Sequence, residues 1–107
     1  MPTKTVNQKF LALADPARLD IVRRLAQGAK TAGQLAGPYK ISRPAISRHL
    51  RVLREAGIAT AEVRGREWWY TIDTKALEDM EKWLEDVRLM WRTALKSLKN
   101  YVEDENG

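Results

Sequence analysis

Apolar residues recur with helical spacing in the first third of the chain. The first such segment covers residues 5–14. A second begins at Asp15, a suitable N-cap that is followed by proline at the first helical position, and it ends at Gly28. Thr31 and Gln34 then have the spacing of a capping box and open a short third helix. The pattern therefore predicts three consecutive helices in this part of the chain.

The clearest pattern lies in residues 42–57, which read S-R-P-A-I-S-R-H-L-R-V-L-R-E-A-G. At 100° per residue, Ile46, Leu50 and Leu53 fall within about 60° of one another and form an apolar stripe. The opposite face is made almost wholly of arginine and serine. A serine N-cap and a C′ glycine bound this segment, so we expect a well-capped helix over residues 42–56.

After this helix the pattern changes to the alternation that is typical of strands. Two runs of β-branched and aromatic residues flank Arg64-Gly65-Arg66, which predicts a β-hairpin over residues 58–72 with an arginine on each side of the tip glycine. The aromatic run Trp68-Trp69-Tyr70 lies in the second strand. We expect it to pack in the core and not to stack on bases, because the arginines and not the aromatics are at the tip.

A long helix is predicted over residues 74–102, with a frayed tail after it, and its apolar residues follow a heptad repeat. At 1.5 Å per residue this helix is roughly 42 Å long, more than a small core can cover. Part of its apolar seam can pack on its own domain. The rest would leave a large apolar patch in water, so we expect a homodimer through this helix and the N-terminal helix. The residues expected at that interface are Val6, Phe10, Leu84, Val87, Trp91, Leu95 and Leu98.

The order of these elements is that of a winged helix-turn-helix: two helices joined by a tight turn, the second rich in arginine, and then a hairpin with a basic tip. We therefore expect one domain over residues 1–107, mainly α with a small β-hairpin wing. Its recognition helix is placed at residues 42–56, its wing at 58–72 and its dimerisation helix at 74–102.

The net charge of +5 is unevenly distributed. Residues 1–72 hold 13 Lys and Arg against 5 Asp and Glu, whereas residues 73–107 hold 6 against 9. A basic half is typical of a surface that binds a polyanion, although a merely soluble domain can show the same asymmetry.

The composition also excludes several classes of protein. The chain has no cysteine, so disulfides and thiolate chemistry are excluded. It has no apolar h-region of a signal peptide and no run of about 18 to 20 apolar residues. We therefore expect a cytoplasmic protein with no membrane partner.

The arginine and serine face of the helix over residues 42–56 suits the DNA major groove, where arginine reads guanine and serine can donate or accept. The arginines of the wing would meet phosphates or the minor groove, and residues near the third helix would lie where backbone phosphates pass. The positions expected to contact DNA from this pattern are Thr31, Gln34, Lys40, Arg43, Pro44, Ser47, Arg48, Arg51, Arg64 and Arg66.

Two further features each allow two interpretations. His49, the only histidine, lies beside the apolar stripe, so it is either a packing residue at the edge of the core or a phosphate contact. Acidic residues cluster early in the last helix, where they favour the N-terminal dipole or, alternatively, hold a hard cation. These acidic residues are Glu78, Asp79, Glu81, Glu85 and Asp86.

Three segments of the chain strongly resemble the ArsR (SmtB/ArsR) family of bacterial winged-helix repressors. They are A-L-A-D-P-A-R-L-D-I-V-R-R-L, the stretch of residues 42–57 and R-G-R-E-W-W-Y-T-I-D. The resemblance implies a homodimeric, nucleoid-associated repressor that binds an inverted repeat at a promoter, often its own. Carried onto this chain, it implies DNA contacts at Ser42, Arg43, Pro44, Ser47, Arg48 and His49, with the wing at residues 64–66.

The chain departs from the family's metal sensors, which carry a cysteine pair in the third helix or Asp/His and His/Glu sets in the last helix. Here the third helix reads T-A-G-Q-L-A-G, and the last helix has no histidine. The chain is therefore similar to a subgroup with a long C-terminal helix and no metal sensing. We expect no metal site and no cofactor.

Other classes of function are distinguishable. A small-molecule regulator would keep the DNA-binding site and add an effector pocket beside the last helix, lined by Trp83, Met90 and Trp91. A protein-interaction module would have lost DNA binding, which the dense arginine face disfavours. An enzyme is disfavoured because Ser47 and His49, two apart on a helix, project about 160° away from each other and cannot act as a nucleophile and its base.

Overall fold

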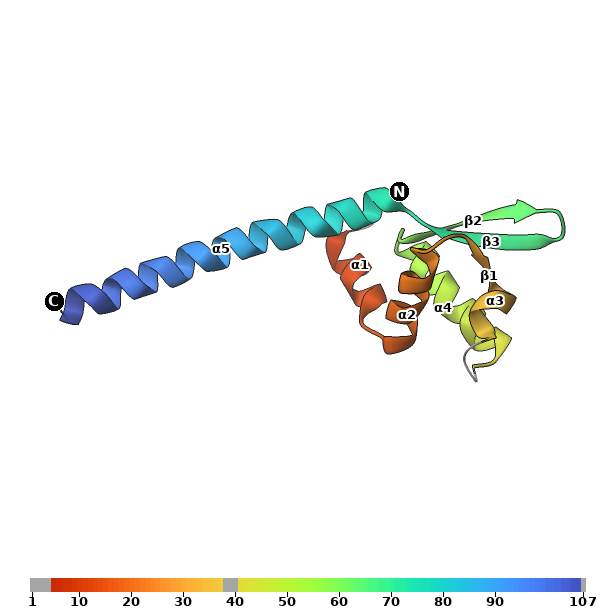
Figure 1. Ribbon diagram of the computed structural model, residues 1–107, viewed down its shortest axis with the longest axis horizontal. Coiled ribbons are helices and arrows are strands. Elements are labelled where there is room, and N and C mark those ends of the chain that lie inside the picture. Colours follow the sequence, from red (N-terminus) through yellow and green to blue (C-terminus); the bar gives the residue numbers. More distant parts are fainter. Residues whose placement is uncertain (1–4, 38–40, 107) are drawn as a thin grey trace.

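A helical domain and one long helix that projects from it make up the computed structural model, which describes residues 5–37 and 41–106 (Figure 1). The principal extents are 71 × 34 × 22 Å, and the longest follows the projecting helix. The elements in chain order are α1 (Val6–Leu13), α2 (Pro16–Leu25), β1 (Lys30–Thr31), α3 (Ala32–Ala36), α4 (Arg43–Glu55), β2 (Ala59–Arg64), β3 (Glu67–Ile72) and α5 (Thr74–Asn106). None of the described helices is apolar over a length that would cross a bilayer.

Side chains that bind backbone N–H groups determine where the helices begin. Asp15 Oδ1 accepts from the N–H groups of the first turn of α2, as its N-cap position predicts. Thr31 and Gln34 form the expected capping box of α3, and Ser42 Oγ accepts from Ala45 N at the start of α4. These predicted caps are therefore confirmed.

The C-terminus of α4 is a Schellman motif, which fixes where the wing begins. Gly57 adopts a φ of 81°, a conformation that side-chain-bearing residues rarely take. Its N–H donates to Arg54 O, and the next N–H, of Ile58, donates to Leu53 O. Ile58 is fully buried beside Leu53 in the core cluster, so the motif also anchors the first strand.

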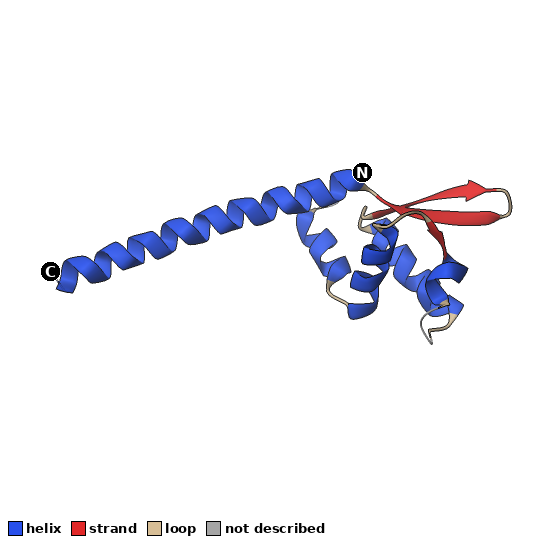
Figure 2. Ribbon diagram, in the orientation of Figure 1, coloured by secondary structure: helices blue, strands red, loops and turns tan. Residues whose placement is uncertain are grey.

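The wing belongs to a three-stranded antiparallel sheet with strand order β1-β3-β2 (Figure 2). Strands β2 and β3 pair from Ala59 with Ile72 to Arg64 with Glu67. The turn between them has a positive φ at Gly65 alone, which is typical of a type II′ turn. Strand β1, which pairs with the middle of β3, was not expected from the sequence.

The core lies between α2, α3, α4 and the start of the wing. Its fully buried side chains are Ile21, Leu35, Ile46, Leu50, Leu53 and Ile58. The apolar stripe predicted for α4 supplies half of this set. One face of α4 is therefore held by the core, and the other is left in water.

Only the first part of α5 packs on the domain. Ala76 and Met80 are buried where α5 crosses α1, and the ring of Trp83 lies 5.1 Å from that of Phe10. The helix then leaves the domain and continues to residue 106, four residues beyond the predicted end (Figure 1). At 1.5 Å per residue, its 33 residues span about 50 Å.

The carboxylates early in α5 do not act on its N-terminal dipole as expected. The first turn holds no acidic residue, and the dipole's effect fades beyond that turn. Asp79 Oδ2 instead lies 4.0 Å from Lys9 Nζ, and Glu85 Oε1 lies 2.7 Å from Arg88 Nη2. Within the described part of the chain, no group of three or more metal-ligating side chains is assembled.

Candidate nucleic-acid interface

Helix α4 presents the predicted polar face to solvent. Because Ile46, Leu50 and Leu53 are buried, the residues on the opposite side of the helix are directed outward. The exposed set comprises Ser42, Arg43, Pro44, Ser47, Arg48, Arg51 and Arg54. This face is cationic over the whole length of the helix and carries hydroxyl groups near its N-terminus.

The N-terminal part of α4, the start of α3 and the wing enclose one hollow of about 440 Å³. Arg43 and Ser47 line it from α4, and Arg66 lines its edge from the tip of the wing. The Arg43 guanidinium packs above Gly33 of α3, where even an added Cβ would lie 3.9 Å from Arg43 Cζ. The structure therefore brings arginines from the helix and the wing, 23 positions apart, around one surface depression.

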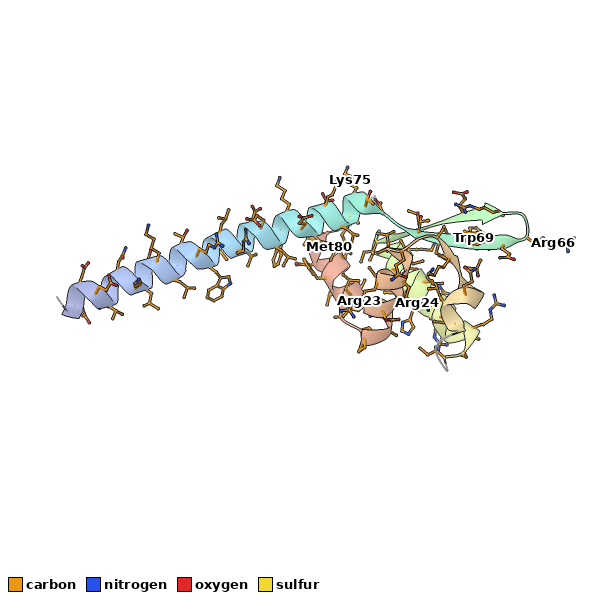
Figure 3. The ribbon with its side chains drawn as sticks, viewed as in Figure 1. Arg23, Arg24, Arg66, Trp69, Lys75 and Met80 are labelled. Atoms are coloured by element: carbon orange, nitrogen blue, oxygen red, sulfur yellow. The ribbon has the colours of Figure 1, made fainter. Side chains whose placement is uncertain are left out.

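The two wing arginines differ in their surroundings. Arg64 Nε donates to Glu62 Oε1 at 3.0 Å, and its guanidinium lies 5.5 Å from the centre of the Trp69 ring. Arg66 follows Gly65 at the tip of the turn and extends away from the domain (Figure 3). Arg64 is therefore paired within the wing, whereas Arg66 is presented to solvent at its tip.

The aromatic run of the wing is divided between core and surface. Tyr70 packs against the core, as expected, whereas Trp69 is half-buried beneath Arg64 and does not join the core cluster. The expectation of core packing is wrong for Trp68, which is 52% exposed and lines the hollow beside Arg43. The guanidinium of Arg54 lies 5.8 Å from the Trp68 ring centre, so this tryptophan joins the wing to the recognition helix.

Thr31 and Gln34 are partly committed to α3 itself. Thr31 Oγ1 accepts from Gln34 N at 3.2 Å, and Gln34 Oε1 accepts from Thr31 N at 3.0 Å. Their first role is therefore to cap the helix, and only their remaining polar atoms can bind phosphate. Lys40, which was also expected to contact DNA, lies outside the described residues.

His49 is half-buried at the edge of α4. Its burial is compatible both with packing at the edge of the core and with a phosphate contact. Its Nδ1 lies 3.4 Å from Arg18 Nη1 of α2, and Arg18 Nε donates to Ala12 O. Backbone N–H groups, that of Arg18 first, and the Arg18 charge lower the pKa of the Asp15 carboxyl. His49 thus belongs to a polar cluster that joins the end of α1 to α2 and α4.

Arg24 joins α2 to α3, a role that no pattern in the sequence indicates. Its Nη1 donates to Leu35 O at 2.8 Å and its Nη2 to Gln34 O at 2.9 Å, so one guanidinium of α2 binds the C-terminal carbonyls of α3. An arginine in the last turn of a helix is usually interpreted as interacting with the dipole of that helix. Only the packing of α3 against α2 shows that Arg24 binds the carbonyl groups of α3 instead.

Comparisons with known proteins agree with this geometry. Residues 15–61, from the N-cap of α2 into β2, match the family model described as bacterial regulatory protein, arsR family. The transcriptional repressor SdpR of Bacillus subtilis is 35% identical over 79 residues, 74% of this chain and 88% of the relative. The HTH-type transcriptional regulator Rv2034 of Mycobacterium tuberculosis is 32% identical over 102 residues, 95% of this chain and 92% of the relative.

The chain belongs to the arsR family. Its fold agrees with that of an ArsR-like transcriptional regulator from Rhodococcus sp. RHA1, with a TM-score of 0.79 at 29% identity over 89% of this chain and 90% of that one. Another ArsR family transcriptional regulator of solved structure gives a TM-score of 0.75 at 30% identity, over 81% and 96% of the two chains. The predicted family and its winged helix-turn-helix fold are confirmed. Like its relatives, this arsR-family protein is a DNA-binding transcriptional regulator and not an enzyme.

The effector pocket suggested beside the last helix is not formed within one chain of this arsR-family protein. The ring of Trp83 packs at an angle against that of Phe10, but Met90 and Trp91 are 63% and 60% exposed. Both follow Trp83 in the sequence by seven or more residues, where α5 projects from the described part of the domain (Figure 1). The prediction assumed that the helix stays against the core, whereas a straight 50 Å helix cannot follow so small a domain.

Proposed function

We propose that the protein is a homodimeric, sequence-specific transcriptional repressor. It would bind an inverted-repeat operator, its own promoter included, without a metal effector. The observation that carries this proposal is the exposed arginine and serine face of α4 together with Arg66 at the wing tip. A groove-reading helix and a phosphate-binding wing on one surface suit a duplex whose major groove is followed by a minor groove.

Base reading is assigned to the exposed residues of α4, and positioning on the backbone to the wing and the start of α3. Arg48 lies on the outer face of α4, away from the hollow that Arg43 and Ser47 line. A guanidinium at this position can bind the O6 and N7 of one guanine in a bidentate manner. Arg66 would contact a backbone phosphate, and such a contact does not distinguish one base sequence from another.

The apolar surface of α5 supports the homodimer. Beyond Trp83 the helix carries exposed Leu84, Trp91, Leu95 and Leu98, the last of them 59% exposed, whereas Val87 is half-buried. A soluble monomer rarely leaves such a patch in water. A second copy that packs along the same seam covers it, and two-fold symmetry then places two recognition helices for two half-sites about one helical turn apart.

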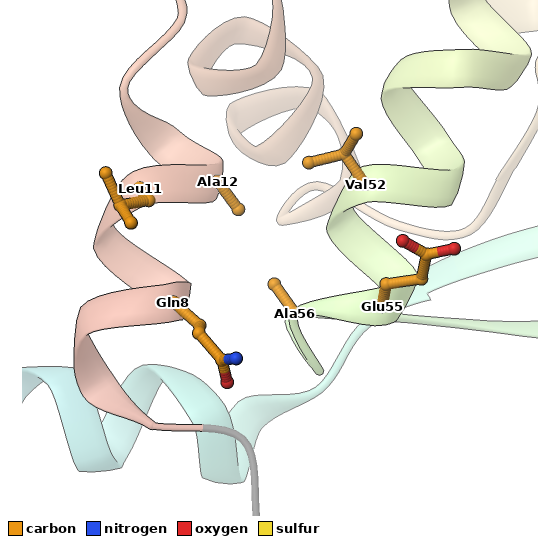
Figure 4. A pocket seen from close by; sticks show the side chains of 6 residues that line it. All are labelled: Gln8, Leu11, Ala12, Val52, Glu55 and Ala56. Atoms are coloured by element: carbon orange, nitrogen blue, oxygen red, sulfur yellow. The ribbon is translucent and has the colours of Figure 1, made fainter.

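Helix α1 adds apolar surface of its own. Gln8 and Ala12 of α1 face Val52 and Ala56 of α4 across an open hollow of about 300 Å³ (Figure 4). Leu11 at its rim is 69% exposed, while Val6 and Phe10 are half-buried beside α5. This surface is continuous with the α1–α5 contact and supports the assignment of α1 to the interface.

DNA binding is tested by fluorescence anisotropy with the protein's own promoter and with a shuffled duplex of equal length. Arg48→Ala should cost about 1–3 kcal/mol on the promoter and much less on the shuffled duplex, because it removes a base contact. Lys82→Ala on α5 removes the same charge away from the interface and serves as the control. Equal affinity of the unmodified protein for the two duplexes would contradict sequence-specific binding.

The homodimer is tested by sedimentation equilibrium. Leu98→Glu places a charge in the seam of α5 and should shift the protein toward the monomer, whereas Lys96→Glu, two residues away, adds a carboxylate at a polar position. A monomeric unmodified protein at micromolar concentration would refute the proposed interface.

Metal independence follows from the donor set. The chain has no cysteine and one histidine, and that histidine lies beside the Arg18 guanidinium. Soft and borderline ions prefer thiolate and imidazole ligands, which are not assembled here. Promoter affinity should therefore be the same with zinc, cadmium or arsenite as with a chelator, and a tenfold change with any of them would refute this part of the proposal.

A further inference from the structure

The inner face of the wing carries two apolar side chains that the core does not cover. Val63 of β2 and Trp68 of β3 are directly opposite each other in the strand register, so both side chains lie on one face of the hairpin. Tyr70, two residues along β3 and therefore on the same face, packs against the core. Val63 and Trp68 lie nearer the tip and are 54% and 52% exposed. The hairpin thus continues its inner face beyond the reach of the core.

Charged side chains, most of them cationic, surround this apolar pair. The guanidinium carbon of Arg54 lies 5.8 Å from the centre of the Trp68 ring. Trp68 also lines the hollow of about 440 Å³ between α4 and the wing, whose charged lining residues are Arg43, Arg66 and Glu67. Three arginines and one carboxylate therefore lie around the indole. Such a surface suits an anionic partner that has apolar faces of its own.

The proposed homodimer leaves this surface in solvent. The long helix α5 projects from one side of the domain and the hairpin from the other (Figure 1). A second copy that packs along α5 and α1 is therefore remote from the wing tip. Tryptophan is highly buried on average in folded proteins, so an indole that is half in water at this place favours a partner other than a second copy.

Duplex DNA bound in the proposed manner brings its backbone to this surface. Helix α4 lies in the major groove, and the wing tip reaches the adjacent minor groove. One sugar–phosphate strand separates two adjacent grooves, so this strand crosses the surface between α4 and the wing. Its phosphates are anionic and the C–H faces of its deoxyribose rings are apolar. These two properties match the arginines and the Val63–Trp68 pair in turn.

We propose that Val63 and Trp68 bind the deoxyribose of the strand that crosses between α4 and the wing, and that Arg54 pairs with a phosphate beside it. The indole supplies contact area without charge, and the guanidinium supplies charge at its edge. Contacts to sugar and phosphate carry no sequence information, so they strengthen binding to every duplex alike. They depend on the proposed placement of DNA against α4 and the wing, but not on the recognition of a particular operator.

The proposal is tested by fluorescence anisotropy with the promoter duplex and the shuffled duplex, each titrated at several salt concentrations. Trp68→Thr keeps a high strand propensity and removes the indole. It should weaken binding to both duplexes alike, by at least about fivefold, because each subunit loses an apolar contact of roughly 20 Å² or more. The slope of log K against log salt should stay unchanged, because an apolar contact releases no counterions.

Three further variants make the result specific. Trp68→Phe keeps a smaller ring and should weaken binding about twofold with an unchanged slope, and Val63→Thr, which keeps the branched shape, should do the same. Leu89→Ala is the control, because Leu89 is 51% exposed on α5 and lies outside the heptad seam; it should bind like the unmodified protein. Far-UV circular dichroism verifies that each variant is folded. If Trp68→Thr is unfolded, Trp68→Phe decides, and an unchanged affinity then overturns the proposal.

The remaining outcomes separate other roles of Trp68. Unchanged affinity of a folded Trp68→Thr variant would show that DNA does not touch the indole. A slope reduced by about 2 per dimer would show that Trp68 only holds Arg54 against a phosphate, and would overturn the sugar contact. A loss on the promoter alone would show a base contact instead. Equal affinity of the unmodified protein for the two duplexes contradicts the proposed sequence specificity, and the effect of Trp68→Thr on either duplex still decides the sugar contact.

Discussion

The contact between Arg24 and the end of α3 gives a prediction about how the helix-turn-helix is held together. Arg24→Met removes the two N–H donors that bind Leu35 O and Gln34 O and keeps an unbranched side chain of similar helix propensity. The carbonyls at the C-terminus of α3 then lose their protein donors. We expect α3 to be less firmly held against α2, and the fold to be less stable.

The magnitude follows from the two bonds. Hydrogen bonds to a charged group contribute about 1.5–3 kcal/mol each, but Arg24 is only half-buried and one of its bonds is exposed to solvent. We therefore take the low end and expect Arg24→Met to cost about 2–3 kcal/mol of unfolding free energy. With a urea m-value of about 1–3 kcal/mol per M, the midpoint should fall by roughly 1 M or more.

Arg23→Met provides a matched control. Arg23 precedes Arg24 in the last turn of α2 and is exposed (Figure 3). The same substitution there removes the same charge, so the difference between the variants isolates the bonds to α3. The assay is urea denaturation followed by far-UV circular dichroism, at one fixed protein concentration because a dimer's stability depends on it. Midpoints within about 0.3 M of each other would refute the structural role of Arg24.

Three further predictions follow from single positions. Gly33→Ala should stabilise the protein by about 0.5–1 kcal/mol in thermal denaturation, because Gly33 has a helical backbone and an added Cβ meets Arg43 only at ordinary contact distance. A loss of stability would show that the Arg43 side chain is more constrained than its contacts indicate. Arg66→Ala should weaken binding to all duplexes alike and reduce the slope of log K against log salt by about 2 per dimer; an unchanged slope would contradict a phosphate contact.

Asp15→Asn tests the lowered pKa of Asp15, since asparagine caps a helix about as well. The stabilisation from the Asp15 charge is present above its unfolded-state pKa and is lost as the pH falls through the lower folded-state value. The variant should therefore differ most from the unmodified protein above about pH 4, and the difference should vanish in more acidic solution. A difference independent of pH would show that the charge itself is not what stabilises α2.

The local features of the fold could be predicted because they depend on residues close together in the chain. The caps at Asp15, Thr31 and Ser42 each bind N–H groups two or three residues away, and the stop at Gly57 needs only a residue that tolerates positive φ. The apolar stripe of α4 requires only helical periodicity to separate its buried and exposed faces. The extent of α4 and the exposure of its arginine and serine face could therefore be predicted without coordinates, whereas the role of that face in DNA contact stays a prediction.

Other features of the fold depend on contacts between segments that are far apart in the sequence. Strand β1 is two residues long and exists because Lys30 and Thr31 pair with Tyr70 and Trp69. Trp68 was expected inside the core, but the register of β3 directs it to the hollow beside α4. Alternation along a strand tells which residues share a face, but what covers that face depends on the neighbouring helix.

The sequence by itself determined the helices, the β-hairpin and the cationic face of α4, since short-range capping and periodicity specify them, and the resemblance of three segments to known repressors indicated the family. The tertiary structure alone decided that Arg24 binds the end of α3 and that α5 leaves the domain after Trp83. Each of these depends on how whole elements pack. Packing depends on the fit of many side chains from distant segments, so a short stretch of sequence does not predict it.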